Sequence, residues 1–199
     1  MGEELGKEFY NDVFSRSEQY RKNYRDTPWY PVWSKIVEHV NSRGIQSVLE
    51  LGCGPGQLAH YLADKGLKEY LGVDFSGQAI SIAQDNFSKH GLKGSFISED
   101  INKFKFENFT YDCVIATEFL EHISNDIDIL NRVSSGSLII GTLPNKDSAG
   151  HVRFYPDSDK ISERKIKQRY KDIGSFISFE KVKYSGGKNH DYLFIILKK

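Results

Sequence analysis

The stretch that decides the fold is Val48-Leu49-Glu50-Leu51-Gly52-Cys53-Gly54-Pro55-Gly56-Gln57. It places an acidic residue, Glu50, inside a short buried strand and follows the strand with three glycines at alternate positions. In an open parallel sheet, ligands bind beyond the carboxyl ends of the strands, and glycines at the first turn let a ligand approach the backbone closely. The stretch therefore predicts a strand that leads into a ligand-binding turn.

The spacing of the glycines indicates what the turn binds. The dinucleotide fingerprint has its third glycine three residues after the second, but Gln57 occupies that position here and Gly56 comes one residue earlier. This spacing argues against pyrophosphate binding and therefore against an NAD-dependent reductase. The chain also has no Tyr-Lys catalytic pair at a recognisable spacing, which such a reductase would need. Asp74 follows Gly54 by 20 residues at the end of the next strand, where an acid commonly accepts hydrogen bonds from ribose hydroxyls. We therefore expect a ligand that contains a nucleoside.

Strand-like and helix-like segments alternate along the rest of the chain. After the first strand, apolar strands are expected at 70–74, 95–98, 111–117 and 137–142, with helices between them, and a helix is expected around 158–172. Two further strands, 175–183 and 192–198, are joined through Gly186 and Gly187, and this short connection requires antiparallel pairing. The pattern predicts a Rossmann-like, doubly wound α/β fold whose seven-stranded sheet is mostly parallel with an antiparallel final strand.

Composition narrows the classes of protein to consider. A chain of 199 residues predicts one domain with decorations, and no apolar run reaches the roughly 20 residues that a membrane helix needs. The balance of 27 basic and 27 acidic residues makes a nucleic-acid partner unlikely on electrostatic grounds. The N-terminus lacks the features of a signal peptide and the two cysteines lie in strand-like segments, so we expect a cytoplasmic protein with free thiols, as a monomer or homodimer.

With these motifs in place, residues 40–199 resemble the class I S-adenosylmethionine-dependent methyltransferase family, in its small bacterial type. The resemblance implies that S-adenosyl-L-methionine is the cofactor and S-adenosyl-L-homocysteine the product. It divides the chain into an N-terminal helical extension or lid, 1–42, and a methyltransferase domain, 43–199. It also implies cofactor contacts from Glu50, Gly52, Cys53, Gly54, Gly56, Gln57, Asp74, Phe75, Asp100, Ile101 and Thr117.

Within that resemblance, single residues have distinct roles. The acid matching Glu50 lies near the amino group of the cofactor, often through water, and Asp74 matches the ribose-binding acid. Asp100 matches the acid that bonds the adenine amino group, while the backbone amide of Ile101 meets the ring. Thr117 lies where the chain leaves the fourth strand beneath the reacting methyl group.

A second informative stretch, Glu118-Phe119-Leu120-Glu121-His122, follows the fourth strand. If it opens a helix, Glu118, Glu121 and His122 stand on one face that points across the cofactor pocket. His151 lies in a loop that leaves the fifth strand toward the same rim.

This constellation has two interpretations. It resembles two branches of the family in which a Glu-x-x-Glu-His segment and a later histidine hold a divalent metal, the small-RNA 3′-terminal 2′-O-methyltransferases and the ubiquinone-pathway O-methyltransferases. The favoured interpretation is metal-free, with His122 or His151 as a general base and Glu118 among the catalytic residues. Metal binding by Glu118, Glu121, His122 and His151 is the alternative.

An aromatic stretch near the N-terminus is expected to shape the acceptor pocket as a lid that excludes water. The residues concerned are Tyr24, Arg25, Trp29, Tyr30 and Trp33; packing on the sheet edge is an equally good explanation for each. Residues 27–33 also weakly resemble the start of small bacterial methyltransferases associated with surface-sugar and secondary-metabolite pathways.

The sequence thus predicts methyl transfer to an oxygen or nitrogen of a small polar metabolite or sugar, with no membrane partner. The alternatives are a metal-dependent RNA 3′-terminal 2′-O-methyltransferase and a noncatalytic cofactor-binding subunit. Because the sulfonium is already activated, the protein mainly has to hold the nucleophile in line with the methyl group, about 3 Å away.

Overall fold

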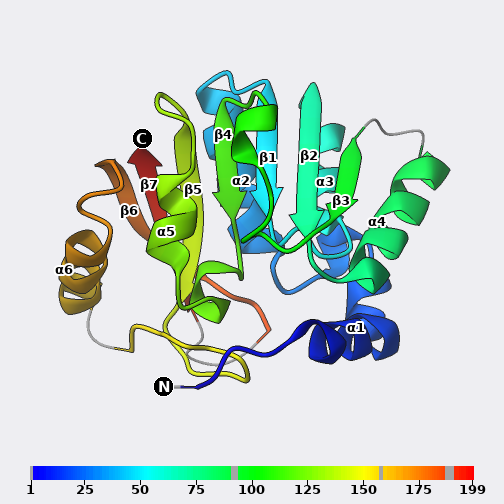
Figure 1. Cartoon of the computed structure of the whole chain (residues 1–199), viewed down its shortest axis with the longest axis horizontal. Coiled ribbons are helices and arrows are strands. Elements are labelled where there is room, and N and C mark those ends of the chain that lie inside the picture. The colour runs from blue at the N-terminus through cyan, green and yellow to red at the C-terminus, as the bar shows by residue number, and fades with distance from the viewer. Residues whose placement is uncertain (1, 91–93, 157–158, 187–190) are drawn as a thin grey trace.

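The structure is a computed structural model that describes residues 2–90, 94–156, 159–186 and 191–199 (Figure 1). One sheet of seven strands forms its centre. The strands are β1 (Ser47–Leu51), β2 (Glu69–Asp74), β3 (Ser95–Ser98), β4 (Cys113–Ala116), β5 (Leu138–Pro144), β6 (Ser175–Lys183) and β7 (Asp191–Lys198).

The order of the strands confirms the predicted fold class. The sheet runs β3-β2-β1-β4-β5-β7-β6, with parallel pairing from β3 to β5 and antiparallel pairing of β7 with both β5 and β6. Gly187, in the expected connection between the last two strands, and residue 158, at the start of the expected helix 158–172, lie outside the described residues.

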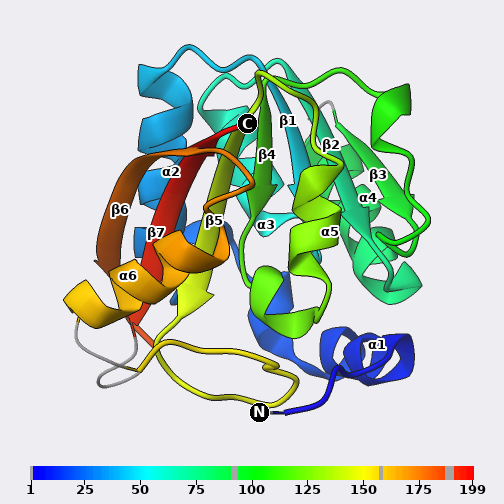
Figure 2. The same ribbon diagram turned by 60° about the vertical axis from the view of Figure 1, so that its left-hand side comes forward.

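Helices cover both faces of the sheet. The α-helices are α1 (Lys7–Arg16), α2 (Tyr30–Ser42), α3 (Gln57–Asp64), α4 (Gly77–His90), α5 (Asp126–Asn131) and α6 (Asp159–Arg169). Helices α2, α3 and α4 pack on one face and α5 and α6 on the other, as the two views show (Figures 1 and 2). Single 3₁₀ turns lie between them: η1 (Glu18–Arg21), η2 (Tyr24–Asp26), η3 (Phe106–Asn108) and η4 (Leu120–His122).

Alternating side chains of the strands form two hydrophobic cores, one on each face. In β7, Leu193, Ile195 and Leu197 pack with α5 and α6, whereas Phe194 and Ile196 pack with the α2 side. A strand buried on both faces needs a nearly continuous apolar sequence, and β7 has one. Helix α2 contributes Trp33 and Ile36 to the same core as β1. The division of the chain into an extension, 1–42, and a methyltransferase domain, 43–199, remains a prediction.

The topology fixes where a ligand can bind. The chain order runs outward in opposite directions from β1 and β4, and a crevice forms beyond the carboxyl ends of such strands. Helix α1 lies across this end of the sheet, at the bottom of Figure 1. Among the described helices, none combines the length and apolarity needed to cross a membrane.

A buried ionic cluster anchors the loop that follows β5. Asp126, at the start of α5, is fully buried and accepts hydrogen bonds from Arg169 and from the hydroxyl of Tyr170, 2.7 Å away. Arg153, in the loop, lies 3.1 Å from the same carboxylate and also donates to the carbonyl of Leu120. The cluster therefore ties the loop carrying His151 to the segment between β4 and α5.

We expect Asp126→Ala to lower the free energy of unfolding by about 3–5 kcal/mol, because two guanidinium groups lose their buried carboxylate. Urea denaturation measures this change. Asp12→Ala is the matched control, since its ion pair with Arg16 is exposed and contributes less than about 1 kcal/mol. Equal losses in the two variants would contradict the prediction.

Candidate active site

A cavity of about 350 Å³ opens at the carboxyl ends of β1, β2 and β4. Its wall is formed by Gly52 after β1, residues 73–75 at the end of β2, residues 99–102 after β3, and the segment after β4. The remaining wall comes from residues 4–6, Tyr10 and Phe14 near the N-terminus. Both the size and the position are those of a small-molecule site in a doubly wound sheet.

Five of the eleven predicted cofactor residues line this cavity: Gly52, Asp74, Phe75, Asp100 and Ile101. Asp74 is 7% exposed, and one carboxylate oxygen accepts the Gly54 N–H at 2.9 Å while the other accepts the Ser76 N–H at 2.8 Å. Burial raises the pKa of Asp74 to about 6, against the lowering effect of these two bonds. Each oxygen keeps a lone pair with which it can accept a ligand hydroxyl.

The conformation of the turn after β1 requires glycine where it meets the cavity. Gly52 has a φ of +69°, and a Cβ there would lie 2.6 Å from the ring of Phe119. A side chain at this position would both strain the backbone and displace that ring.

The other predicted cofactor residues, Glu50, Cys53, Gly54, Gly56, Gln57 and Thr117, are not among the residues that line the cavity. Glu50 is 2% exposed and accepts the Tyr70 hydroxyl at 2.6 Å, and burial raises its pKa to about 8. The Gln57 side chain donates to the carbonyls of Gln19 and Lys22, so it holds the N-terminal segment against α3. Their roles toward the cofactor remain predictions.

The expectation that residues 118–122 open a helix is wrong. Glu118 has a φ of +51°, the one positive φ of a non-glycine residue in the described ranges, and only Leu120–His122 forms a 3₁₀ turn. The Glu118 N–H is instead bonded to Thr142 on β5, which bends the chain sharply as it leaves β4. Glu118 consequently does not share a helix face with Glu121 and His122.

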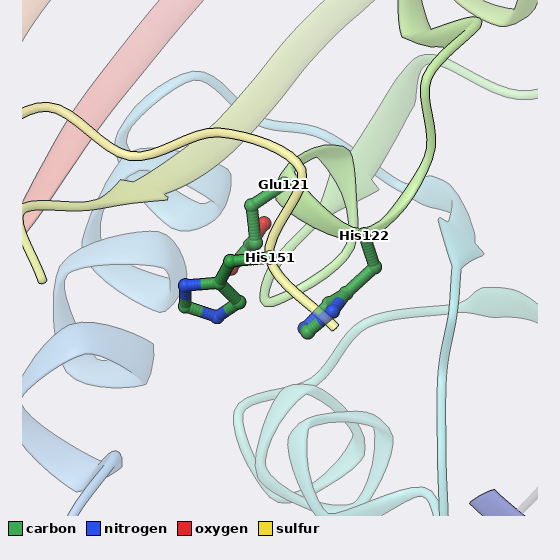
Figure 3. Close-up of side chains that lie close together, drawn as sticks. All are labelled: Glu121, His122 and His151. Carbon is green, nitrogen blue, oxygen red and sulfur yellow. The ribbon is translucent and has the colours of Figure 1, made fainter. Parts of the chain in front are cut away.

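The bend nevertheless brings three of the four candidate ligands together. One atom each of Glu121, His122 and His151 lie within 4.8 Å of one another, and the three side chains point into a common space (Figure 3). Glu121 is fully buried, and neither carboxylate oxygen has a hydrogen-bond partner among the described residues. Burial therefore raises the pKa of Glu121 well above its usual value.

Backbone carbonyls orient both imidazole rings. His122 Nδ1 lies 3.1 Å from the carbonyl oxygen of Gly150, and His151 Nδ1 lies 3.2 Å from that of Lys146. Because a carbonyl can only accept, these contacts favour a proton on each Nδ1 and a lone pair on each Nε2. Burial lowers the pKa of His122 to about 4 and lowers that of His151, so both rings are neutral.

Of the five predicted acceptor residues, only Trp29 lies against Glu118, and none of the five lines the cavity. Its indole N–H faces Glu118 without reaching hydrogen-bond geometry, and Glu118 also accepts the Tyr192 hydroxyl at 2.5 Å. Tyr24 stacks on Tyr61 and donates to a carboxylate on α3 instead. The other predicted acceptor residues pack near that helix or in the adjacent core: Arg25, Tyr30 and Trp33.

The predicted site residues include none of the first 16, although residues 1–42 were expected to form a helical extension or lid. The cavity is lined by Glu4, Leu5, Gly6, Tyr10 and Phe14. The signal available in the sequence was the spacing of Tyr10 and Phe14, which puts two aromatic rings on one face of a short helix. The pattern indicates an apolar contact but does not identify the surface that it covers.

Comparison with known proteins gives independent information. Residues 48–135 match the family model described as "Methyltransferase domain". The chain is 35% identical over 96 residues to a pavine N-methyltransferase of Thalictrum flavum subsp. glaucum, covering 45% of the chain and 26% of that protein. It is 30% identical over 132 residues to a ubiquinone biosynthesis O-methyltransferase of Vibrio campbellii, covering 63% of the chain and 55% of that protein. The matches thus span about half or less of these relatives' length.

The fold has counterparts among solved structures. A magnesium protoporphyrin IX methyltransferase from Synechocystis PCC 6803, with bound S-adenosylhomocysteine, superposes with a TM-score of 0.75 at 15% identity. The superposition covers 97% of each chain. The [4+2]-cyclase SpnF superposes with a TM-score of 0.72, also at 15% identity. At such identities the likeness shows the shared fold.

The buried Glu50 makes stability depend on pH. Its pKa is raised in the folded protein, so the folded state retains a proton that the unfolded chain loses, and stability falls as pH rises from about 4.5 to about 8. Glu50→Gln removes the ionisable group while still accepting the Tyr70 hydroxyl. Relative to wild type, we expect this variant to gain thermal stability between about pH 5 and about pH 9, and the exposed Glu69→Gln not to do so. If the melting temperatures of Glu50→Gln and wild type change with pH in the same way across this range, the prediction is wrong.

Proposed function

We propose that this chain, whose residues 48–135 match a methyltransferase family model, is a class I S-adenosylmethionine-dependent methyltransferase that binds this cofactor and transfers its methyl group to a small molecule. The observation that carries the proposal is one continuous cavity that has Asp74, the ribose-binding candidate, in its wall together with Glu118 and His122. A nucleoside and a reacting group can therefore occupy the same site.

The residues around the cavity suit the proposed cofactor. Asp74 would accept hydrogen bonds from the ribose hydroxyls, and Asp100 and Ile101 would contact the adenine. The turn at Gly52 would direct the methionine portion toward β4. A buried carboxylate that keeps free lone pairs at the cavity wall is the feature that best fits a ribose diol. When bound, the sulfonium supplies an activated methyl group.

The acceptor side needs a base only if the nucleophile is a hydroxyl. The neutral Nε2 of His122 or His151 would take the hydroxyl proton as the oxygen forms its bond to the methyl carbon, while the carbon–sulfur electron pair returns to sulfur. A positioned base of this kind contributes about 10²- to 10⁴-fold in rate. An amine nucleophile requires mainly orientation, for which Glu118 is suitably placed.

The acceptor in this proposal is an oxygen or nitrogen of a small polar metabolite or sugar. Support comes from Glu118, whose second carboxylate oxygen has no partner among the described residues, and from the indole of Trp29 that faces it. Trp29 stacks on Tyr20 and contacts Tyr184, which gives an aromatic wall next to a carboxylate. Sugars and amines are both recognised by that combination. The names of the two curated relatives include an N- and an O-methyltransferase, so both atoms stay in the proposal.

A metal-dependent version of the reaction is the second candidate, and Glu121 is the observation that favours it. Glu121 is a buried carboxyl group with two unpartnered oxygens beside two neutral imidazoles, and burial raises its pKa because carrying a charge there is costly without a bound cation. The carbonyls on each Nδ1 leave each Nε2 free to coordinate, as in protein metal sites. A divalent ion here would orient and acidify an acceptor hydroxyl, which also keeps 3′-terminal RNA methylation among the alternatives.

We expect Asp74→Ala to weaken S-adenosylhomocysteine binding about tenfold or more, because a charged hydrogen bond contributes on the order of 1.5–3 kcal/mol. Calorimetry on folded protein measures the affinity. Asp85→Ala, on the exposed face of α4, is the control and should bind as wild type does. Asp74→Asn covers the case in which the alanine variant misfolds. Unchanged affinity in both Asp74 variants would remove this residue from the cofactor site, and no binding by wild type would refute the proposed function.

The metal version makes a separate prediction. After chelation, wild type should bind one Mn²⁺ per chain by calorimetry, and Glu121→Gln should weaken that binding at least about tenfold, as loss of a ligand does. Glu118→Gln should retain the ion, because Glu118 lies outside the group of three ligand atoms. If wild type binds no Mn²⁺ and turnover survives the chelator, the metal-free histidine base is the mechanism. His122→Ala should then lower turnover while leaving cofactor affinity nearly intact.

A further inference from the structure

The wall of the cavity carries an excess of negative charge. Five of its residues are acidic: Glu4, Asp74, Glu99, Asp100 and Glu118. Among the described residues that form the wall there is no lysine or arginine, and the ring of His122 is neutral because burial lowers its pKa to about 4. The whole chain has equal numbers of basic and acidic residues, so the excess belongs to the cavity and not to the composition. The cavity therefore favours cations and disfavours phosphates and carboxylates.

Two tyrosines near the cavity show the effect of these carboxylates. Burial, followed by the carboxylates of Glu121 and Asp74, raises the pKa of Tyr10, which lines the wall. Burial and then Glu118 raise the pKa of Tyr20. Each hydroxyl resists ionisation because its new negative charge would form near existing ones. The same carboxylates would stabilise a positive charge placed there.

Aromatic residues form much of the remaining wall. Four of them line the cavity: Tyr10, Phe14, Phe75 and Phe119. The ring centroid of Tyr10 lies 5.4 Å from that of Phe75 and 6.4 Å from that of Phe14. The faces of aromatic rings attract organic cations, and more strongly where water is displaced. Carboxylates combined with such rings are the chemistry that recognises an organic cation.

Glu118 is the wall carboxylate best placed for a second ligand group. Asp74, Glu99 and Asp100 lie at or just after the ends of β2 and β3, where the proposed function places the nucleoside. Glu4 is exposed. Glu118 follows β4, and its Oε1 is buried with no hydrogen-bond partner among the described residues. A buried carboxylate oxygen in this state is stabilised by a charged donor from a ligand.

We propose that the methyl acceptor is an amine and that Glu118 binds its nitrogen. This inference rests on the proposed function and narrows its acceptor to one chemical class. As the lone pair of the neutral amine forms its bond to the methyl carbon, the carbon–sulfur electron pair returns to sulfur. The positive charge thereby passes from sulfur to nitrogen, and no proton has to leave before the methyl group is transferred. The charge stays inside the acidic wall, where Glu118 stabilises it as it forms.

Sinefungin tests the role of Glu118, because this cofactor analogue carries an ammonium group on carbon in place of the methylated sulfonium. By calorimetry, wild type should bind sinefungin at least about tenfold more tightly than S-adenosylhomocysteine, since a charged hydrogen bond is gained. Glu118→Gln should lose this preference while binding S-adenosylhomocysteine within about threefold of wild type. Glu99→Gln, which removes a wall carboxylate after β3, is the matched control and should keep the preference.

The outcomes separate this inference from the proposed function. If wild type binds neither ligand, both fail. If wild type binds the two ligands equally tightly, only the amine proposal fails. It fails as well if Glu99→Gln loses the preference to the same extent as Glu118→Gln, because the general charge of the wall is then sufficient.

A second experiment tests the acceptor class on wild type alone, so it does not depend on how a variant folds. Choline and the neutral alcohol in which carbon replaces its nitrogen have the same shape, and only choline is a cation. On protein saturated with S-adenosylhomocysteine, an NMR titration should show choline binding at least about tenfold more tightly than the alcohol. Equal affinity, no binding of choline, or tighter binding of a short RNA than of choline would overturn the amine acceptor.

Discussion

The bond between the Asp74 carboxylate and the Gly54 N–H is the constraint on which the site depends. It fixes the turn after β1 against the end of β2, and the second oxygen of Asp74 fixes the start of α4 through Ser76. The bond thereby holds the turn whose Gly52 lines the cavity. A hydrogen bond to a buried carboxylate is stronger than one between neutral groups, which suits a loop that has to keep its shape without a ligand.

The cluster of Glu121, His122 and His151 depends on a different anchor. Val152 donates to the carbonyl of Glu121 at 2.8 Å, and Arg153 joins the same loop to Asp126. These bonds set the distance between His151 and His122, although neither Val152 nor Arg153 lines the cavity. The histidine cluster is therefore a tertiary feature, built by residues about 30 positions apart that meet through backbone bonds and one buried ionic group.

The fold could be predicted from the sequence because its signals are local. Alternating apolar strands and helices, and the short connection before β7, are sufficient for the seven-stranded mixed sheet. Part of the site followed from the same logic, since Asp74 ends β2 and Asp100 follows the end of β3. The bend at Glu118 could not be predicted, because a bond to Thr142 on another strand overrides the helical spacing of Glu121 and His122. The position of α1 over the cavity could not be predicted either, since amphipathic spacing does not specify which surface a helix covers.

Several departures from ordinary folding rules lie near the carboxyl ends of β1, β2 and β4. Glu118 adopts a φ that costs a non-glycine residue of the order of 1–3 kcal/mol, and burial raises the pKa of Glu50, Asp74 and Glu121. Elsewhere, strands such as β7 bury apolar side chains on both faces, which offsets these costs. Strain and unpaired buried carboxylates persist only where the surrounding structure over-determines them. Their coincidence at the ends of β1, β2 and β4 makes this end of the sheet the strongest candidate for a ligand-binding site, because strained and perturbed groups cluster at functional sites.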